Sequence, residues 1–265
     1  MKIGFLGCGN MGGALARAIS KNRELSLLVH DPCAERECAL KTEIGACSQT
    51  AGEMAREADF LFLGVKPGLV GAVLAEIQEQ IAQNKELCLV SMAAGVTLSQ
   101  LASYVPEATA IIRIMPNTSV GVGAGMTVFA ANAFVSEEKK QRFARIMAPT
   151  GTLDELAEGL IDAESAVAGS GPAFAYMFLD ALADGGVLCG LARDKALLYA
   201  AKMLEGAART YLASGKHPDA LKDEVCSPGG STIEGVLALE DGGLRACVAN
   251  AIVKTCEKAK KLGKS

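Results

Sequence analysis

A strand-like run at the N-terminus leads directly into a glycine-rich turn, and this pair constrains the fold more than any other feature. After the run KIGFLG, the spacing G-x-G-x-x-G is formed by Gly7, Gly9 and Gly12, ahead of a helical segment. The first glycine permits a tight turn, the second lets a pyrophosphate approach the backbone, and the third lets the helix pack on the strand. The motif predicts a dinucleotide site that includes Asn10 and Met11 at the helix N-terminus; a glycine-rich turn without a ligand is the alternative.

Four further apolar runs follow, and helical segments separate them. Near-continuous apolar runs suit strands that are buried on both faces of a parallel sheet. Strand–helix–strand repetition of this kind predicts an α/β fold with a Rossmann-type doubly wound sheet. The five expected strands are residues 2–7, 25–30, 60–65, 87–92 and 110–115.

Beyond about residue 160 the chain has no strand-like run. Residues 161–190 are apolar on almost every side, which is typical of a helix that is buried all round, whereas residues 193–215 have an ordinary amphipathic pattern. Such an apolar helix needs a partner subunit to cover it. We therefore expect a dinucleotide-binding Rossmann domain at residues 1–158 and an all-α domain for dimerisation and substrate binding at residues 159–265.

The composition argues against several other classes of protein. A formal net charge of −4 disfavours sequence-independent binding to nucleic acid or to an anionic membrane. The chain also has no run of 18 apolar residues, which argues against a membrane-spanning helix. The nine cysteines have no C-x-x-C spacing and only two histidines accompany them, which predicts a reducing compartment and no metal site. Because the N-terminus lacks signal-peptide character, we expect a cytoplasmic protein.

The end of the second expected strand bears on the choice between NADH and NADPH. Asp31 lies 19 positions after Gly12, close to the spacing of about 20 at which an acid binds the ribose 2′-hydroxyl of NAD. Arg36 lies within reach of a 2′-phosphate instead. A third reading is that Asp31 and Pro32 only turn the chain.

Two further strand ends carry residues that suit a cofactor contact. Ligands of doubly wound sheets bind at the carboxyl ends of the strands, where small residues let the backbone lie along the cofactor. Small residues that save space under a helix are the alternative. The residues in question are Val65, Lys66 and Pro67 after the third strand, and Ala93, Ala94 and Gly95 after the fourth.

The start of the apolar helix lacks a residue that a hydride-transfer enzyme acting on an alcohol requires. Such an enzyme needs a general base, and related two-domain hydroxyacid dehydrogenases place a lysine on the first long helix of the α domain. Residues 166–178 read AVAGSGPAFAYMF and contain no lysine, histidine or acid. A substrate with a protonated C=N bond needs no such base, because the cation itself accepts hydride.

Seven segments, in order and at proper spacing, together resemble the pyrroline-5-carboxylate reductase family over essentially the whole chain. They are GFLGCGNMG (4–12), VKP (65–67), AAGV (93–96), MPNT (115–118), AGSGPAFAY (168–176), DALADGG (180–186) and SPGGSTIEG (227–235).

The resemblance implies NAD(P)H-dependent reduction of 1-pyrroline-5-carboxylate to L-proline, the last step of proline synthesis. It also implies an interlocked homodimer built through the α domain, commonly assembled further into a ring of dimers. Asp31 departs from the small or basic residues of many members, so either NADH or NADPH is open as cofactor. A reductase of another small cyclic imine and a dinucleotide sensor without catalysis are the alternative functions.

The segment SPGGSTIE joins a tight glycine turn to a row of hydroxyl residues. The pattern S-x-x-E predicts that Ser231 caps a helix. The neighbouring Gly229 and Gly230 leave the backbone accessible as an anion nest. We therefore expect the amides around Ser231 and Thr232 to hold the substrate carboxylate, with help from the Ser227 hydroxyl. The family resemblance places Thr232 near the ring nitrogen, as the catalytic residue.

A proline early in the apolar helix predicts a local break. Pro172 has no N–H group to donate to the carbonyl of Ala168, so we expect a kink that leaves polar backbone near the site. A kink with a purely structural role is the alternative.

Overall fold

The computed structural model of the chain describes residues 1–262. They form two compact units: residues 1–170 with the residues from 256 onward, and residues 171–255. The first unit is α/β and the second is all-α, as the sequence predicts. The first unit continues to residue 170, and Ile161 is buried against the sheet. The domain boundary between residues 158 and 159 stays a prediction.

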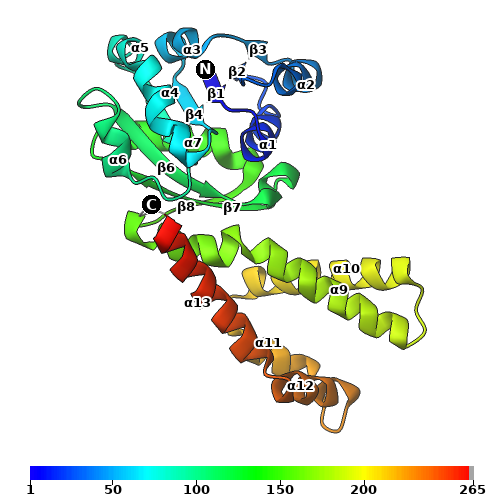
Figure 1. The fold of residues 1–265 in the computed structure, drawn as a ribbon. Coiled ribbons are helices and arrows are strands. Elements are labelled where there is room, and N and C mark those ends of the chain that lie inside the picture. The colour runs from blue at the N-terminus through cyan, green and yellow to red at the C-terminus, as the bar shows by residue number, and fades with distance from the viewer. Residues whose placement is uncertain (263–265) are drawn as a thin grey trace. The chain divides into compact units, whose positions relative to one another are not determined.

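An eight-stranded sheet forms the centre of the first unit (Figure 1). Its order is β3-β2-β1-β4-β5-β6-β7-β8, and the chain reverses its course across the sheet between β1 and β4. Neighbouring strands are parallel except β6 and β7, which are antiparallel. The strands are β1 (Lys2–Leu6), β2 (Ser26–His30), β3 (Cys47–Ser48), β4 (Phe60–Leu63), β5 (Cys88–Ser91), β6 (Ala110–Pro116), β7 (Gly125–Ala131) and β8 (Gly151–Glu155).

Helices cover both faces of this sheet, which confirms the doubly wound architecture. On one face α1, α2 and α7 bury a core in which the rings of Phe5 and Phe62 stack at 4.8 Å. On the other face α3, α4, α5 and α6 bury a second core of mainly aliphatic side chains. The helices are α1 (Asn10–Ile19), α2 (Ala34–Ile44), α3 (Ala51–Glu57), α4 (Val70–Glu76), α5 (Gln78–Gln83), α6 (Leu98–Ser103) and α7 (Glu137–Met147), with 3₁₀ turns η1 (Pro67–Leu69), η2 (Thr118–Val122), η3 (Ala148–Thr150) and η4 (Glu158–Leu160).

The five predicted strands are present as β1, β2, β4, β5 and β6. Three strands were not predicted: the two-residue β3, the antiparallel β7 and the edge strand β8. These additions extend the sheet at both of its edges and leave the predicted centre unchanged.

Long helices make up the second unit. Gly215 ends α10 in the left-handed conformation, with φ +63°, as is usual for glycine after a helix. The elements are α9 (Gly171–Leu188), α10 (Arg193–Ser214), α11 (Pro218–Val225), α12 (Ser231–Asp241) and α13 (Leu244–Leu262).

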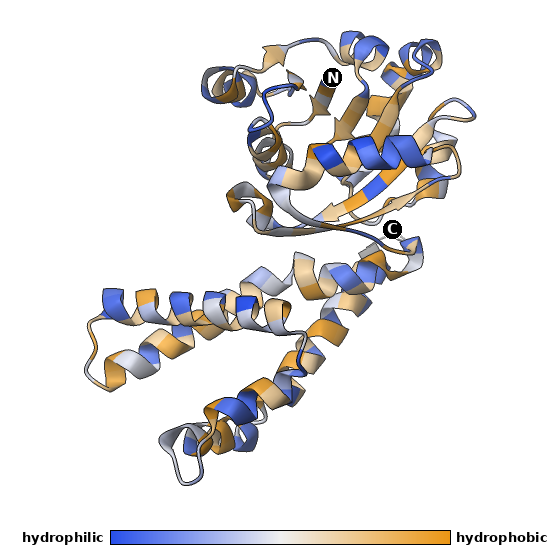
Figure 2. Ribbon diagram, turned by 180° about the vertical axis from the view of Figure 1, so that it is seen from behind, coloured by the Kyte–Doolittle hydropathy of each residue, from blue (hydrophilic) through white to orange (hydrophobic). Residues whose placement is uncertain are grey.

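The apolar helix α9 is not buried within the single chain. Ala183 is its one buried residue, while Tyr176 and Met177 are 66% and 73% exposed. Apolar residues are distributed along the helices of this unit (Figure 2). The burial expected from the sequence is therefore not reached within this unit, which leaves an exposed apolar surface of the kind that marks an interaction site.

The helical segment that begins after the sheet is interrupted where the sequence predicts a break. The short helix α8 (Ile161–Glu164) continues into a π-helical turn, η5 (Ser165–Gly169), and α9 begins at Gly171. In the turn, the Ser170 amide donates to the Ser165 carbonyl at 2.8 Å. Pro172 thus lies in the first turn of a new helix, where its missing N–H group costs no hydrogen bond of α9.

By length and composition alone, the run Glu158–Leu188 is the one helical segment among the described residues that could cross a membrane. The core helix of a soluble protein passes the same test, so this run is weak evidence for a membrane span.

Candidate active site

The glycine-rich turn holds three backbone segments in close contact. Gly7 has φ +95°, and its carbonyl oxygen lies 2.2 Å from the position that a Cβ atom of Gly12 would occupy. The same oxygen lies 2.5 Å from the corresponding position of Gly64, which follows β4. A side chain at Gly12 or Gly64 would therefore separate β1 from α1 or from the end of β4. Gly64 was not predicted, because its role depends on a neighbour from a distant strand.

The start of α1 is suited to bind an anion. Gly9 is the N-cap residue, and no side chain caps the helix. The first helical amides, including those of Asn10 and Met11, remain available to a phosphate group, and the helix dipole favours negative charge there. A Cβ atom on Gly9 would meet no protein atom closer than 4.0 Å. Gly9 thus borders open space in which a pyrophosphate can approach the backbone.

A cavity of about 290 Å³ opens beside this turn. Both of its arginines are ion-paired, Arg17 with Glu43 and Arg36 with Asp31, and their side chains are 44% and 56% exposed. A cationic, accessible side chain beside a helix N-terminus extends the anion-binding surface. The cavity is lined by Cys8, Gly9, Asn10, Arg17, Glu35, Arg36 and Ala39.

Asp31 is turned toward the protein. Its side chain is 5% exposed, and it accepts hydrogen bonds from the Cys8 amide at 2.7 Å and the Cys33 amide at 2.9 Å. Arg36 lies 3.5 Å from the same carboxylate. Asp31 therefore supports the glycine-rich turn from behind, and the turn role that the sequence left open is present.

Burial, and then the neighbouring Asp31 carboxylate, raises the pKa of the Cys8 thiol to about 12. The thiol therefore stays neutral across the physiological range of pH, and no anionic sulfur repels a phosphate at this turn.

The other predicted cofactor residues lie at the same edge of the sheet. Because β1, β4 and β5 are parallel neighbours, the segments that follow them meet at their carboxyl ends. Val65 is half-buried, and Lys66 and Pro67 are exposed. Among the small residues after β5, Ala93 is buried, whereas Ala94 is exposed. Gly95 adopts φ +77°, which turns the chain and leaves the backbone accessible.

The predicted substrate residues form a second group, in the all-α unit. Ser227 to Gly230 make a tight turn in which the Gly230 amide donates to the Ser227 carbonyl at 3.0 Å. Pro228 and Gly229, the latter with φ +66°, occupy the central positions, as in a type II turn. The Ser227 hydroxyl lies 2.4 Å from the position of a Gly230 Cβ atom, so it lies directly beside the start of α12.

The prediction that Ser231 caps α12 is wrong. Gly230 is the N-cap residue, Ser231 is the first helical residue, and no side chain caps the helix. Since glycine has no capping side chain, no side-chain acceptor reaches the first amides of the helix, those of Ser231, Thr232 and Ile233. Thr232 itself is exposed. The correction leaves more free amides for a carboxylate than the sequence suggests.

Ion pairs link the helices that carry this turn. Arg245 at the start of α13 binds Asp219 of α11 at 2.8 Å and Glu240 of α12 at 2.7 Å. The hydrogen bond from Arg245 lowers the pKa of Asp219. Glu224, one turn before Ser227, is paired with Lys216 at 2.6 Å, so it is already engaged within its own unit.

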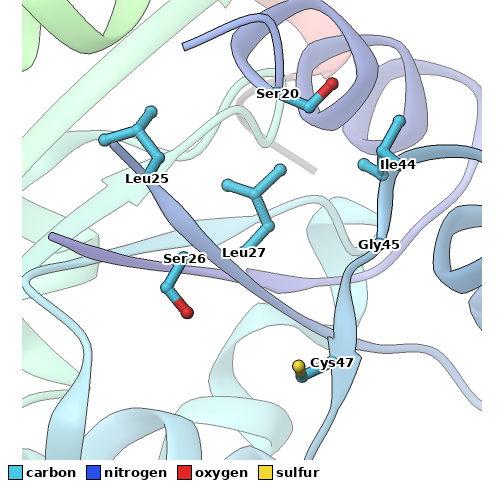
Figure 3. Close-up of a pocket in the computed structure, with 7 residues that line it drawn as sticks. All are labelled: Ser20, Leu25, Ser26, Leu27, Ile44, Gly45 and Cys47. Atoms are coloured by element: carbon cyan, nitrogen blue, oxygen red, sulfur yellow. The ribbon is translucent and has the colours of Figure 1, made fainter. Parts of the chain in front are cut away.

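Another cavity, of about 280 Å³, lies near the start of β2, away from the carboxyl ends of the strands (Figure 3). None of its seven lining residues, which run from Ser20 to Cys47, is charged or belongs to the predicted site. It therefore offers no group to hold a pyrophosphate. Within residues 1–262, no three His, Cys, Asp or Glu side chains gather in a metal-binding cluster.

Comparison with known proteins identifies the family. Residues 158–262 match the family described as pyrroline-5-carboxylate reductase dimerisation, and residues 2–95 match the family described as NADP oxidoreductase, coenzyme F420-dependent. A pyrroline-5-carboxylate reductase of Escherichia coli is 43% identical over 100% of this chain and 99% of its own length. The chain belongs to the pyrroline-5-carboxylate reductase family.

Solved structures support the same assignment. A Plasmodium falciparum pyrroline carboxylate reductase with NADP bound has a TM-score of 0.88 and 30% identity, covering 99% of this chain and 98% of that one. A Coxiella burnetii pyrroline-5-carboxylate reductase has a TM-score of 0.90 and 29% identity, with coverage of 99% and 98%. The residues at the glycine-rich turn fit a dinucleotide, and the protein is an NAD(P)-dependent oxidoreductase.

Two alanine substitutions separate the two roles of glycine in this turn. We expect Gly12→Ala to lower the free energy of unfolding by about 1–3 kcal/mol, because its Cβ atom overlaps the Gly7 carbonyl. Gly9→Ala should leave the melting temperature nearly unchanged and raise the Kd for NADPH about tenfold or more, because its methyl group enters open space where the pyrophosphate would lie. Thermal melting and NADPH fluorescence titration measure the two effects. If Gly9→Ala binds NADPH as tightly as the wild type, the cofactor lies elsewhere.

Proposed function

We propose that this protein catalyses the NAD(P)H-dependent reduction of 1-pyrroline-5-carboxylate to L-proline. The observation that carries the proposal is the 43% identity, over the full length of both chains, to a protein named pyrroline-5-carboxylate reductase. The match covers 100% of this chain, so it spans both the glycine-rich turn and the SPGGST loop.

Hydride transfer to this substrate requires a bound cofactor and a held imine. The reduced nicotinamide, when bound at the edge formed by Gly7, Gly64 and the segment after β5, supplies the hydride that reduces the C=N carbon. The protein has to place the substrate, exclude water and stabilise the change of charge at nitrogen. Because the protonated imine is itself electrophilic, the absence of a base at residues 166–178 is consistent with this reaction.

The proposed substrate site is the start of α12. The uncapped amides of Ser231 and Thr232 hold the carboxylate, and the helix dipole adds to the attraction. Gly230 keeps that approach free of a side chain, and the adjacent Ser227 hydroxyl donates a further hydrogen bond. The Thr232 hydroxyl is the proposed catalytic group, because it orients the ring nitrogen or relays its proton as the iminium becomes an amine.

We further propose that NADPH is preferred to NADH, with Arg36 as the selecting residue. The Asp31 carboxylate is occupied by two amides and partly neutralised by Arg36, so its repulsion of a 2′-phosphate is weakened. Arg36 lines the cavity beside the glycine-rich turn, and its side chain is 56% exposed, so its guanidinium is accessible to a 2′-phosphate. The other proposed cofactor contacts are Asn10, Met11, Val65, Lys66, Pro67, Ala93, Ala94 and Gly95.

The exposed apolar face of the second unit is proposed to be the interface of a homodimer, from which a ring of dimers can be built. Residues 158–262 match a dimerisation family, and side chains such as Met177 and Leu188 are 73% and 89% exposed in the single chain. We propose a cytoplasmic enzyme that binds neither nucleic acid nor membrane. Sedimentation at micromolar concentration should show a dimer or larger species, and a folded monomer of 27.4 kDa would refute this proposal.

A direct assay tests the proposed reaction. Oxidation of NADPH and of NADH is followed with 1-pyrroline-5-carboxylate and with its six-membered analogue, and the product is identified as L-proline by chromatography. Turnover with the six-membered imine alone would indicate a different cyclic-imine reductase. Cofactor binding without turnover of either imine would indicate a dinucleotide sensor.

Substitution of Arg36 tests the cofactor assignment. We expect Arg36→Gln to raise the Kd for NADPH about tenfold or more, because a charge-assisted hydrogen bond to the 2′-phosphate is lost, and to leave the Kd for NADH within about twofold. Arg23→Gln, an exposed site beyond the C-terminal end of α1, removes the same charge as a control. The measurement is fluorescence titration with each cofactor. An equal loss of affinity for both cofactors would contradict the assignment.

Two substitutions in the SPGGST loop separate catalysis from anchoring. We expect Thr232→Ala to lower kcat about tenfold, because its hydroxyl acts where charge changes most in the transition state. Ser227→Ala should instead raise KM for the imine more than it lowers kcat. Steady-state kinetics over a range of pH measures both, with NADPH affinity as the control. If Thr232→Ala keeps the wild-type kcat at every pH and alters only KM, then the threonine is an anchor.

A further inference from the structure

Two asparagines terminate the antiparallel pair β6 and β7 in the same way. At one end, the Asn117 amide donates to the Met126 carbonyl and the Met126 amide donates to Asn117 Oδ1, both at 3.2 Å. At the other end, the Asn132 amide donates to the Ile111 carbonyl at 3.0 Å and the Ile111 amide donates to Asn132 Oδ1 at 3.1 Å. In both cases the side-chain oxygen replaces the main-chain carbonyl in the ladder, because that carbonyl is used in the following turn.

The two asparagines differ in what their amide nitrogen binds. Asn132 Nδ2 donates to the carbonyl of Thr109 at 2.9 Å, immediately before β6. Asn117 Nδ2 donates at 3.0 Å to the carbonyl of Ala168, which is 51 residues further along the chain and lies in the π-helical turn. Asn117 is also the more buried of the pair, with 9% exposure.

The carbonyl that Asn117 binds is the one that a proline leaves without a donor. In a continuous helix the amide of residue 172 would donate to Ala168, but Pro172 has no N–H group. The Asn117 amide supplies the missing hydrogen bond. It thereby fixes the turn Ser165–Gly169 to the end of β6.

The end of β6 lies at the cofactor edge of the sheet. Because β6 is parallel to β5, Asn117 follows its strand at the same edge as Gly7, Gly64 and Gly95. Asn132 lies at the opposite edge, because β7 runs antiparallel to β6. The sheet thus has one asparagine side-chain hydrogen bond to a carbonyl at the cofactor edge and an equivalent one at the opposite edge.

We propose that Asn117 is a positioning residue for hydride transfer: through the Ala168 carbonyl it holds the segment 165–170 beside the cofactor edge. The inference rests on the proposed reductase activity. Neither Asp nor Ala can replace the asparagine, since the role needs an acceptor for Met126 and a donor for Ala168 on one short side chain. No positioning role follows for Asn132, because its Nδ2 donates to the Thr109 carbonyl at the opposite edge of the sheet.

The test compares Asn117→Asp with its matched control Asn132→Asp in the full-length assembled protein. Each variant keeps the oxygen that accepts from the ladder amide and replaces one donating nitrogen with oxygen. We expect Asn117→Asp to lower kcat about tenfold or more through misplacement of the reacting groups, with NADPH affinity within about twofold of wild type. Asn132→Asp should lower kcat less than about twofold. Both variants should lose a similar amount of thermal stability.

Two further readouts separate positioning from a loss of folded protein. With NADPH deuterated at the transferred position, the isotope effect on kcat should rise in Asn117→Asp, because hydride transfer itself becomes slower. Hydrogen exchange of the peptide that contains the Ser170 amide should accelerate in Asn117→Asp and stay unchanged in Asn132→Asp. A smaller active fraction would change neither the isotope effect nor the affinity for NADPH.

The outcomes are distinct. An unchanged kcat and isotope effect in Asn117→Asp, or equal losses of kcat in both variants, would overturn the positioning role. If the wild type itself fails to reduce 1-pyrroline-5-carboxylate, the proposed function is wrong. Hydrogen exchange then tests the structural claim alone, that Asn117 holds segment 165–170. In that case acceleration confined to Asn117→Asp supports the hold on segment 165–170, and equal exchange in the two variants overturns it.

Discussion

The close approach of three glycines around one carbonyl oxygen is the constraint on which the arrangement of the first unit depends. The Gly7 oxygen lies where side chains of Gly12 and Gly64 would otherwise project, so β1, α1 and the end of β4 can meet without a gap. That contact lies at the point where the strand order reverses. It aims the free amides of α1 at the space in which we propose that a pyrophosphate binds, and the buried Asp31 supports the turn from its other side.

The two units reach their stability in different ways. The first has two cores, one on each face of its sheet, built from long runs of apolar side chains. The second has only Ala183, Ala196 and Ala200 as buried residues among those described between 171 and 255. A single copy of that unit buries too little apolar surface to be stable alone. The loop that we propose to hold the substrate is therefore expected to depend on assembly for its shape.

Elements with a strong local signal could be predicted from the sequence, and elements defined by distant neighbours could not. The apolar runs gave the five central strands, whereas β3 has two residues and β8 is a partly exposed edge strand with two acids. Gly64 and Asn117 each act through a carbonyl far away in the sequence, so their roles could not be predicted, although Asn117 lies in the MPNT segment that contributes to the family resemblance. The S-x-x-E pattern was misleading at Ser231, since the preceding tight turn makes Gly230 the N-cap residue.

The paired asparagines also restrict how this part of the chain can vary in length. A deletion within β7 would shift its register by one residue, move its buried side chains to the opposite face, and take Asn132 away from the Ile111 amide. The turn between the two strands is different, because residues 121–124 are exposed and lie outside both asparagine ladders. Between Asn117 and Asn132, insertions and deletions that keep these hydrogen bonds are therefore confined to this turn, and the number of residues from Met126 to Asn132 is fixed.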